Sequence, residues 1–428
     1  MLEFKETTKT YTKEEALEEA KRCLNCKKPF CQNGCPAHLR TNEFIQAIKN
    51  DDLALAYKLI MEGTNLSPIC SRVCNHYDQC IGNCILNKAK KEPIKVGYLE
   101  RYVLDNYQGE LEQEMLRRDV KIGIIGSGPA GLSCALELVK NGVEAHVYEK
   151  DEHLGGILSY GIPEYRLPKA LVNKYIDFLK RMGVKFYNNN PKTVEELKKA
   201  GYNKVFVGCG LGKYNKMRIP GEDLDGVIDG GTFLRKVNLK EGFNEGEGYK
   251  LEGITYVVGA GNVAMDCARC SQRVGSNQTV VVYRRTLDEA PASKEEIRDA
   301  KEEGVLFNFL HNPVEVIGEN GKVKAIKCEI MELGEEDSSG RRRPVGTGKY
   351  ETFECDNVLV AIGQSPDDSL NEVFSLNTDH GYIVSSDGIS TSDEDVLAGG
   401  DIVRGADTVV GAMVDGKNAA KKILELLK

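Results

Sequence analysis

The chain has 428 residues and a formal net charge of -8, with 65 acidic and 57 basic residues. This length exceeds one ordinary hydrophobic core, so we expect two or three domains. The acidic balance, without a stripe of Lys and Arg interleaved with aromatic residues, excludes electrostatic support for nucleic-acid binding. No signal-peptide core or apolar run of membrane length is present, so we expect a cytoplasmic protein that binds neither nucleic acid nor membrane.

The first 110 or so residues are predicted to be helical. Thr12 and Glu15 form a capping-box pattern, and apolar residues then recur at helical spacing. Further helical patterns cover residues 42–50, 52–63 and 97–107. Such short helices need an additional stabilising element between them.

Cysteines supply that element. The chain has 14, and a cytosolic protein keeps its thiols reduced, which favours metal ligation over disulfides. Eight lie in the first 84 residues: Cys23, Cys26, Cys31, Cys35, Cys70, Cys74, Cys80 and Cys84. Four-cysteine zinc sites are the alternative. The uneven gaps, with Pro36 directly after the fourth cysteine, are more typical of ferredoxin-like runs, and they favour two 4Fe-4S clusters.

A charged segment from Glu110 to Asp119 leads into a strand, a glycine turn, a helix and a second strand over residues 121–150. The turn Gly126, Gly128, Gly131, with Pro129 and Ala130 inside it, allows backbone amides to approach a pyrophosphate. Glu149 ends the second strand, where a carboxylate accepts ribose hydroxyls. The alternative is that the glycines only permit a tight turn.

A second unit of this type begins at residue 254. Its turn is a GxGxxA variant made of Gly259, Gly261, Asn262, Val263 and Ala264. The strand after it ends in Arg284 and Arg285, and paired guanidiniums suit the 2′-phosphate of NADPH. The alternative is two exposed basic residues at a strand end.

Two cysteines on the helix after the second turn, Cys267 and Cys270, spell CxxC. We expect them to be buried and structural, because cysteine is among the most often buried residues. Segments near Val205, Val358 and Val396 are predicted to be further buried strands.

Taken together, the cysteine pattern and two nucleotide folds resemble the small (beta) subunit of bacterial glutamate synthase, the amino-terminal half of dihydropyrimidine dehydrogenase and the large subunit of bifurcating NADH-dependent ferredoxin:NADP oxidoreductase. The resemblance spans nearly the whole chain. It implies one cluster on Cys23, Cys26, Cys31 and Cys84, and a second on Cys35, Cys74, Cys80 and Glu100. Cys70 matches a cysteine that the family does not use. Asn75 departs from the proline of many relatives.

The resemblance also assigns FAD to the first nucleotide fold. It places Gly156 and Arg166 beside the flavin, Asp401 at the ribityl chain, and Thr408 near the flavin ring. Ala361, Ile362 and Gly363 resemble a segment that crosses between the domains. The expected fold is therefore α/β, and its domains in order are a helical two-cluster domain (1–115), the first part of an FAD domain (116–245), an inserted NADPH domain (246–354) and the second part of the FAD domain (355–428).

The expected activity is transfer of a hydride from NADPH to FAD, followed by passage of single electrons through the two clusters. Hydride transfer needs parallel stacking of the two rings, so we expect no catalytic side chain. An electron-accepting partner is expected: a glutamate synthase large subunit, a ferredoxin-linked flavoprotein or another reductase. Two alternatives remain, namely the large subunit of an electron-bifurcating oxidoreductase and a redox-inactive binding scaffold.

Overall fold

A computed structural model of the chain describes residues 2–8, 10–109, 115, 117–337, 340–367 and 374–428. The chain divides into two compact units. The smaller unit comprises Met1–Lys5, Tyr160–Tyr165 and Lys213–Gln364, and the larger unit comprises Glu6–Ser159, Arg166–Gly212 and Ser365–Lys428. Most of the charged segment expected before the first strand lies outside the described residues. Among the described residues, no helix is long and apolar enough to cross a membrane.

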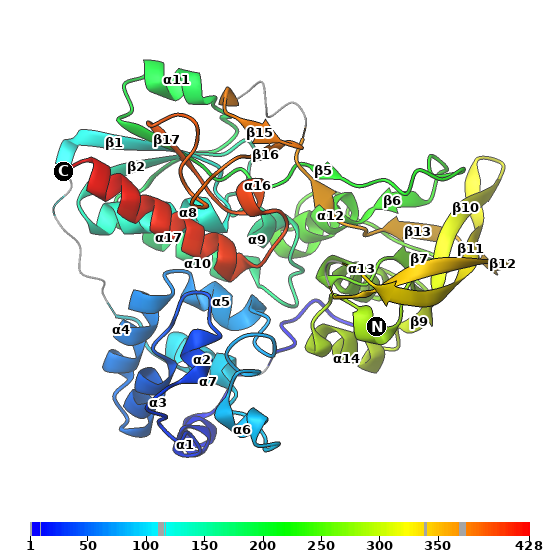
Figure 1. Cartoon of the computed structure of the whole chain (residues 1–428), viewed down its shortest axis with the longest axis horizontal. Coiled ribbons are helices and arrows are strands. Elements are labelled where there is room, and N and C mark those ends of the chain that lie inside the picture. The colour runs from blue at the N-terminus through cyan, green and yellow to red at the C-terminus, as the bar shows by residue number, and fades with distance from the viewer. Residues whose placement is uncertain (1, 9, 110–114, 116, 338–339, 368–373) are drawn as a thin grey trace. The chain divides into compact units, whose positions relative to one another are not determined.

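The larger unit begins with short helices (Figure 1). They are α1 (Lys13–Lys21), α2 (Phe30–Asn33), α3 (Thr41–Lys49), α4 (Leu53–Gly63), α5 (Ser67–Val73), α6 (Ile85–Lys88) and α7 (Val96–Asn106). The predicted capping box is present, because the Glu15 amide donates to Thr12 Oγ1 at 3.2 Å and the Thr12 amide donates to Glu15 Oε2 at 2.8 Å. Phe44, Ile45 and Ile48 of α3 are buried in the core of this helical region.

A parallel five-stranded sheet forms the rest of the larger unit, in the order β17-β4-β1-β2-β3. Its strands are β1 (Arg117–Ile125), β2 (Val143–Tyr148), β3 (Lys185–Tyr187), β4 (Lys204–Val207) and β17 (Val396–Ala398). The accompanying elements are α8 (Pro129–Lys140), α9 (Ile157–Tyr160), α10 (Lys169–Arg181), α11 (Val194–Lys199), α16 (Asp401–Arg404), α17 (Val409–Leu426), β15 (Thr378–Asp379) and β16 (Tyr382–Ile383). Helix α17 packs against α8 so closely that a Cβ at Gly416 would lie 2.0 Å from the Ala130 carbonyl oxygen.

The smaller unit has its own parallel sheet, in the order β6-β13-β7-β8-β9. Its strands are β6 (Val227–Asp229), β7 (Ile254–Val258), β8 (Gln278–Tyr283), β9 (Leu306–Phe309) and β13 (Asn357–Val360). It also contains α12 (Gly230–Phe243), α13 (Asn262–Arg273), the 3-10 helix η1 (Leu287–Glu289) and α14 (Lys294–Glu302), and β5 (Lys213–Tyr214) pairs with β14 (Gln364–Ser365). The boundaries 246 and 354 drawn from the sequence are therefore too narrow for this sheet, because β6 and β13 complete it on one side of β7.

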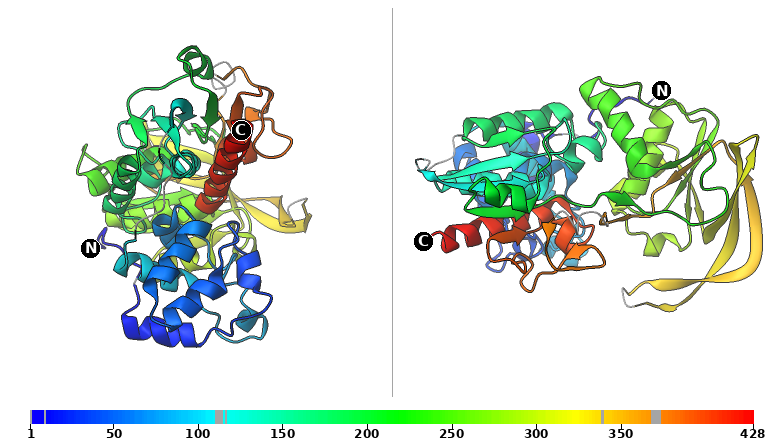
Figure 2. Two further views of the ribbon diagram at one scale, coloured as in Figure 1. Left: turned by 90° about the vertical axis from the view of Figure 1, so that its left-hand side faces the viewer. Right: turned by 90° about the horizontal axis from the view of Figure 1, so that it is seen from above.

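An antiparallel sheet that the sequence patterns did not predict extends from the same unit (Figure 2). It consists of β10 (His311–Glu319), β11 (Lys322–Glu336) and β12 (Arg342–Glu354). Val316, Ile326 and Cys328 pack its base against strands of the parallel sheet. The far parts of β11 and β12 are largely exposed, so the base anchors this sheet.

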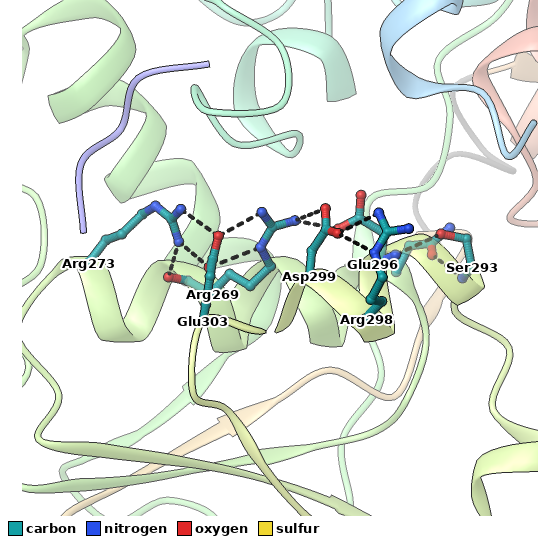
Figure 3. Close-up of polar contacts among 8 residues, drawn as sticks. Arg269, Arg273, Ser293, Glu296, Arg298, Asp299 and Glu303 are labelled. Carbon is teal, nitrogen blue, oxygen red and sulfur yellow. Dashed lines mark hydrogen bonds and ion pairs between the residues drawn. The ribbon is translucent and has the colours of Figure 1, made fainter. Parts of the chain in front are cut away.

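Helices α13 and α14 are joined by buried ion pairs (Figure 3). The Arg269 guanidinium donates to Glu303 at 2.8 Å and to Glu296 at 2.9 Å, and Arg273 donates to Glu303 at 2.6 Å. Both guanidiniums lie over the ring of Tyr165, at 4.6 and 4.0 Å from its centroid. The arrangement satisfies buried charges with opposite charges and an aromatic face.

Candidate functional site

The first predicted cysteine group lines one pocket in the helical region. Its members come from three stretches of chain. Cys23 and Cys26 lie in the loop between α1 and α2, Cys31 is on α2, and Cys84 is the N-cap residue of α6. Burial and the nearby Cys23 and Cys84 raise the pKa of Cys31 to about 11. All four are free thiols. A buried thiol of this kind becomes a stable thiolate when a metal supplies the compensating charge.

Among the described residues, no three His, Cys, Asp or Glu side chains are placed to bind one metal ion together. The four thiols nevertheless line a common space, whose other walls are mainly apolar, including Ile45, Ile94 and Val96. The donor set and its surroundings fit a group larger than one ion, in which each sulfur binds a separate iron.

The second predicted group lies deeper in the same region. Burial raises the pKa of Cys80 well above its usual value, and the charges of Glu100, Cys35 and Cys74 add to that rise. Glu100 is on α7 and only 5% exposed, so it does not lie on a solvated helix face. Burial raises its pKa to about 8, while a hydrogen bond with Thr64 acts in the opposite direction. A buried carboxylate among three thiols fits an oxygen donor to iron.

Two residues near Cys74 in the sequence, Cys70 and His76, also have buried side-chain atoms. Cys70, on α5, is 2% exposed, and its thiol hydrogen-bonds that of Cys74, which raises the pKa of Cys74. It therefore lies close to the group. His76 follows in the next loop, where its Nε2 is buried without a hydrogen-bond partner and burial lowers its pKa to about 4. Its ring packs on Gly97, where a Cβ would lie 2.5 Å from it.

The first glycine turn joins β1 to α8. A Cβ at Gly131 would lie 2.0 Å from the Gly126 carbonyl oxygen, so the third glycine is required for close packing of strand and helix. A Cβ at Gly128 would meet no atom within 4 Å, so the backbone there faces open space at the N-terminus of α8. Pro129 and Ala130 are the first two helical residues. The turn fits a dinucleotide pyrophosphate.

Glu149 lies beneath this turn. Its Oε2 accepts hydrogen bonds from the Ser127 amide at 2.9 Å and the Ser127 hydroxyl at 2.6 Å. The same hydroxyl accepts from the Gly155 amide, and a Cβ at the adjacent Gly156 would lie 3.2 Å from Gly128 Cα. The segment around Gly156 thus lies beside the turn, as expected. Arg166 is partly exposed just before α10, and its place at a flavin stays a prediction.

The C-terminal segment also reaches the turn. A Cβ at Gly400 would lie 3.2 Å from Ala130 Cβ, and the Gly400 amide donates to Asp415 Oδ2 at 2.8 Å. Asp401 follows, and burial raises its pKa to about 6. Thr408 caps α17 by accepting a hydrogen bond from the Gly411 amide, so its hydroxyl has a helix-capping role in addition to the predicted one.

The second glycine turn lines a cleft of about 850 Å³ in the smaller unit. The cleft brings together Gly259, Gly261, Arg284 and Arg285, which were predicted for the nicotinamide nucleotide, and the predicted crossing segment Ala361, Ile362 and Gly363. A Cβ at Gly259 would lie 2.3 Å from the Ala361 carbonyl oxygen, so turn and strand end are in close contact. The volume is in the range of sites for large ligands.

The other three predicted residues of this turn have different surroundings. Asn262 Oδ1 accepts the Ser293 amide at 2.9 Å, Val263 is 39% exposed and Ala264 is fully buried. Cys267 and Cys270 are also fully buried, and Cys267 donates to the Gly230 carbonyl.

The two predicted arginines of the cleft have different surroundings. Arg284 is exposed. Arg285 is 7% exposed, and its guanidinium donates to the Arg342 carbonyl at 2.7 Å and to Asp337 at 2.9 Å. Both arginines line the cleft, and Arg284 is the more exposed of the two. The sequence interpretation missed Arg218 and Arg341, which also line the cleft.

Two family models together match most of the chain. Residues 1–111 match the family model "Dihydropyrimidine dehydrogenase domain II, 4Fe-4S cluster", and residues 120–416 match the model "Pyridine nucleotide-disulphide oxidoreductase". The fold is similar to that of Mycobacterium tuberculosis FprA in complex with NADPH, with a TM-score of 0.62 and 21% identity over 72% of this chain and 85% of that one. The fold and these matches define the protein as an oxidoreductase of the pyridine nucleotide-disulphide class.

Relatives narrow the class to a family. Glutamate synthase [NADPH] small chain from Halomonas elongata is 36% identical over 99% of this chain and 93% of its own length. The same protein from Escherichia coli K12 is 34% identical over 100% and 94%. NADP(+)-dependent formate dehydrogenase subunit beta from Moorella thermoacetica is 37% identical over 94% of this chain, which spans 61% of that subunit. The chain belongs to the family of glutamate synthase small chains.

Proposed function

We propose that the protein oxidises NADPH and delivers the electrons one at a time, through FAD and two 4Fe-4S clusters, to a partner subunit. The observation that carries the proposal is the presence of two separate cysteine groups in the same compact unit as the flavin-type turn. When bound, FAD accepts a hydride and releases single electrons, and each cluster accepts one. The chain's own residues hold these groups and exclude water.

We assign one cluster to Cys23, Cys26, Cys31 and Cys84, and the other to Cys35, Cys74, Cys80 and Glu100. The apolar walls of the first pocket and the burial of the second group keep the sulfurs away from water. The family model matched by residues 1–111 supports iron-sulfur clusters over zinc. Glu100 supplies the oxygen donor, and Cys70 is the competing position.

The second group lies on the side of the flavin-type fold. Thr64 hydrogen-bonds Glu100, and the next residue, Asn65, is 1% exposed. Asn65 Nδ2 donates to the Ser133 carbonyl at 3.1 Å, and the Ser133 hydroxyl donates to Asn65 Oδ1 at 2.8 Å. Ser133 lies on α8, the helix that begins at the glycine turn. These bonds support an order in which electrons reach the second group first and the first group afterwards.

NADPH is assigned to the cleft of the smaller unit. The exposed Arg284 suits the 2′-phosphate, and Gly261 leaves the start of α13 accessible to the pyrophosphate. We place FAD at the first turn, where Glu149 stands beneath the glycines.

The relatives named above include small and beta subunits, which supports a partner subunit for this chain. A glutamate synthase large chain is the partner that family membership favours.

Metal and flavin analysis after anaerobic reconstitution tests the proposal. Two cubanes and one flavin predict on the order of eight irons and one FAD per chain. Zinc at the cysteines, or iron sufficient for a single cluster, would contradict it.

A further inference from the structure

The pocket of the first cysteine group opens on an apolar surface. Leu24 and Phe30 line this pocket and are 62% and 39% exposed. Large apolar side chains exposed side by side at one pocket mark an interaction surface more often than scattered ones do.

Lysines surround these two side chains. The segments 21–31 and 84–91, which supply Cys23, Cys26, Cys31 and Cys84, contain seven basic residues and no acidic one. The chain as a whole has more acidic than basic residues. The positive charge is therefore a local property of the two segments that enclose this pocket.

One contact joins the two lysine-bearing segments at this surface. Lys88 Nζ lies 3.9 Å from the centroid of the Phe30 ring, so the α6 segment and the α2 segment meet there. Lys27, Lys28, Lys90 and Lys91 are exposed and, like Lys88, form no ion pair with any described residue. Lys21 and Arg22 are paired with Glu18 and Glu19, and the nearby Glu92 is paired with Lys95. Five lysine charges thus remain available to a partner.

We propose that Leu24, Phe30, Lys27, Lys28, Lys88, Lys90 and Lys91 form the docking surface for an acidic electron-accepting protein. The proposal rests on the proposed function, because that function places the last cluster in this pocket. An apolar centre with a charged rim is the usual composition of a protein interface. Positive charge steers an acidic partner to the surface and rejects a basic one. An anionic membrane would match the charge, but it contains no group that takes an electron from the pocket.

With a separate acceptor that takes one electron, the electron balance gives two docking events per NADPH. NADPH gives up a hydride and becomes NADP⁺, and two acceptor proteins each take one electron. NADPH and two oxidised acceptors therefore yield NADP⁺, one proton and two reduced acceptors.

Two haem proteins of opposite charge test the surface: cytochrome b5, which is acidic, and cytochrome c, which is basic. In the reconstituted full chain, Lys90→Glu with Lys91→Glu should slow NADPH-driven reduction of cytochrome b5 roughly tenfold at low salt. The same variant should reduce cytochrome c faster than the native chain does. The effect should shrink between 0.01 M and 0.15 M salt, as the screening length falls from about 30 Å to about 8 Å. Lys27→Glu with Lys28→Glu should behave in the same way.

A matched control reverses two exposed lysines on other helices of the same unit, Lys174→Glu with Lys421→Glu. It should leave both haem reduction rates unchanged. Equal slowing by the control, or unchanged rates in both test variants, would overturn the docking surface. Binding of the native chain to phosphatidylglycerol vesicles, lost in both test variants, would also overturn it in favour of a membrane surface. Iron content and NADPH bleaching of the flavin are measured in each variant, and their absence in the native chain would instead refute the proposed function.

Discussion

The two cysteine groups use similar short motifs but have different surroundings. Cys23 and Cys26 are partly exposed, in a pocket with Leu24 and Phe30 at its edge. The second group includes the buried Cys80 and Glu100 and is connected to α8 through Asn65. Under the proposed function, this difference in surroundings, more than motif spacing, distinguishes the cluster that receives electrons from the one that delivers them.

The two glycine turns make the same point. Each follows a strand of a parallel sheet, β1 or β7, and each begins a helix. Glu149 stands beneath the first turn, whereas Arg284 follows the strand beside the second. A carboxylate suits ribose hydroxyls and a guanidinium suits a phosphate, so the same backbone motif is proposed to bind FAD at the first turn and NADPH at the second.

Removing one ligand from each cysteine group should have the largest effect. Cys74→Ala and Cys26→Ala should each lose one of two EPR signals and roughly half of about eight irons. The lost signal should differ between the two variants. Loss of the same signal in both would show that the eight cysteines do not form two independent groups.

Changing the arginines of the cleft should have the next largest effect. Arg284→Ala with Arg341→Ala removes charge-assisted bonds of roughly 1.5 to 3 kcal/mol each, so NADPH should bind at least about 100-fold more weakly. NADH binding should change little. Arg285→Ala is the contrasting variant, because its guanidinium already bonds Asp337, and we expect it to lower stability more than affinity. Equal losses for both nucleotides would contradict this assignment; binding is measured by calorimetric titration.

These arginines show what the sequence could and could not provide. The glycine turns, the capping box at Thr12 and the burial of Cys267 are determined by nearby residues, and sequence patterns predicted them. The Asp337 partner of Arg285 lies 52 positions away, beyond β10 and β11, so no local pattern could reveal it. Arg341, which lines the same cleft, also lies beyond these two strands, and the burial of His76 depends on Gly97 of a separate helix. The ligand roles and domain limits predicted from the sequence stay predictions where no contact tests them.

The ion pairs of the smaller unit should have a moderate effect on stability. Burial raises the pKa of Glu303, but hydrogen bonds from Arg273 and Arg269 outweigh burial and hold it below its usual range. The stability that Glu303 contributes is therefore fully present when the pH is above the ordinary carboxyl pKa. It is lost as the pH falls through the lowered pKa of Glu303. Glu303→Gln should cost about 3 kcal/mol, because it leaves buried guanidiniums without a charge partner.

A second carboxylate paired with two arginines, in the larger unit, provides a comparison for this prediction. Glu6 pairs with Arg72 at 2.8 Å and Arg101 at 2.9 Å, but its own side chain is 21% exposed, against 13% for Glu303. Glu6→Gln should therefore cost less than Glu303→Gln. Calorimetric unfolding of both variants at pH 7 measures the difference, and a larger loss in Glu6→Gln would reverse the ranking.

The smallest effect is expected at the oxygen donor. Glu100→Ala should shift or remove the EPR signal of the second group alone, because an oxygen ligand changes the potential and spin state of its cluster. Cys70→Ala should leave both signals intact. The opposite result would transfer the ligand role to Cys70, which already contacts Cys74.

Stopped-flow electron delivery tests the central claim most directly. The reconstituted chain is mixed with NADPH and either cytochrome b5 or ferricyanide, a small acceptor that can reach the flavin itself. We predict that Cys26→Ala and Cys74→Ala each lose cytochrome b5 reduction by more than about 100-fold and retain ferricyanide reduction, since a cluster missing from either position interrupts the same path. Undiminished cytochrome b5 reduction in either variant would contradict a path that passes through both clusters.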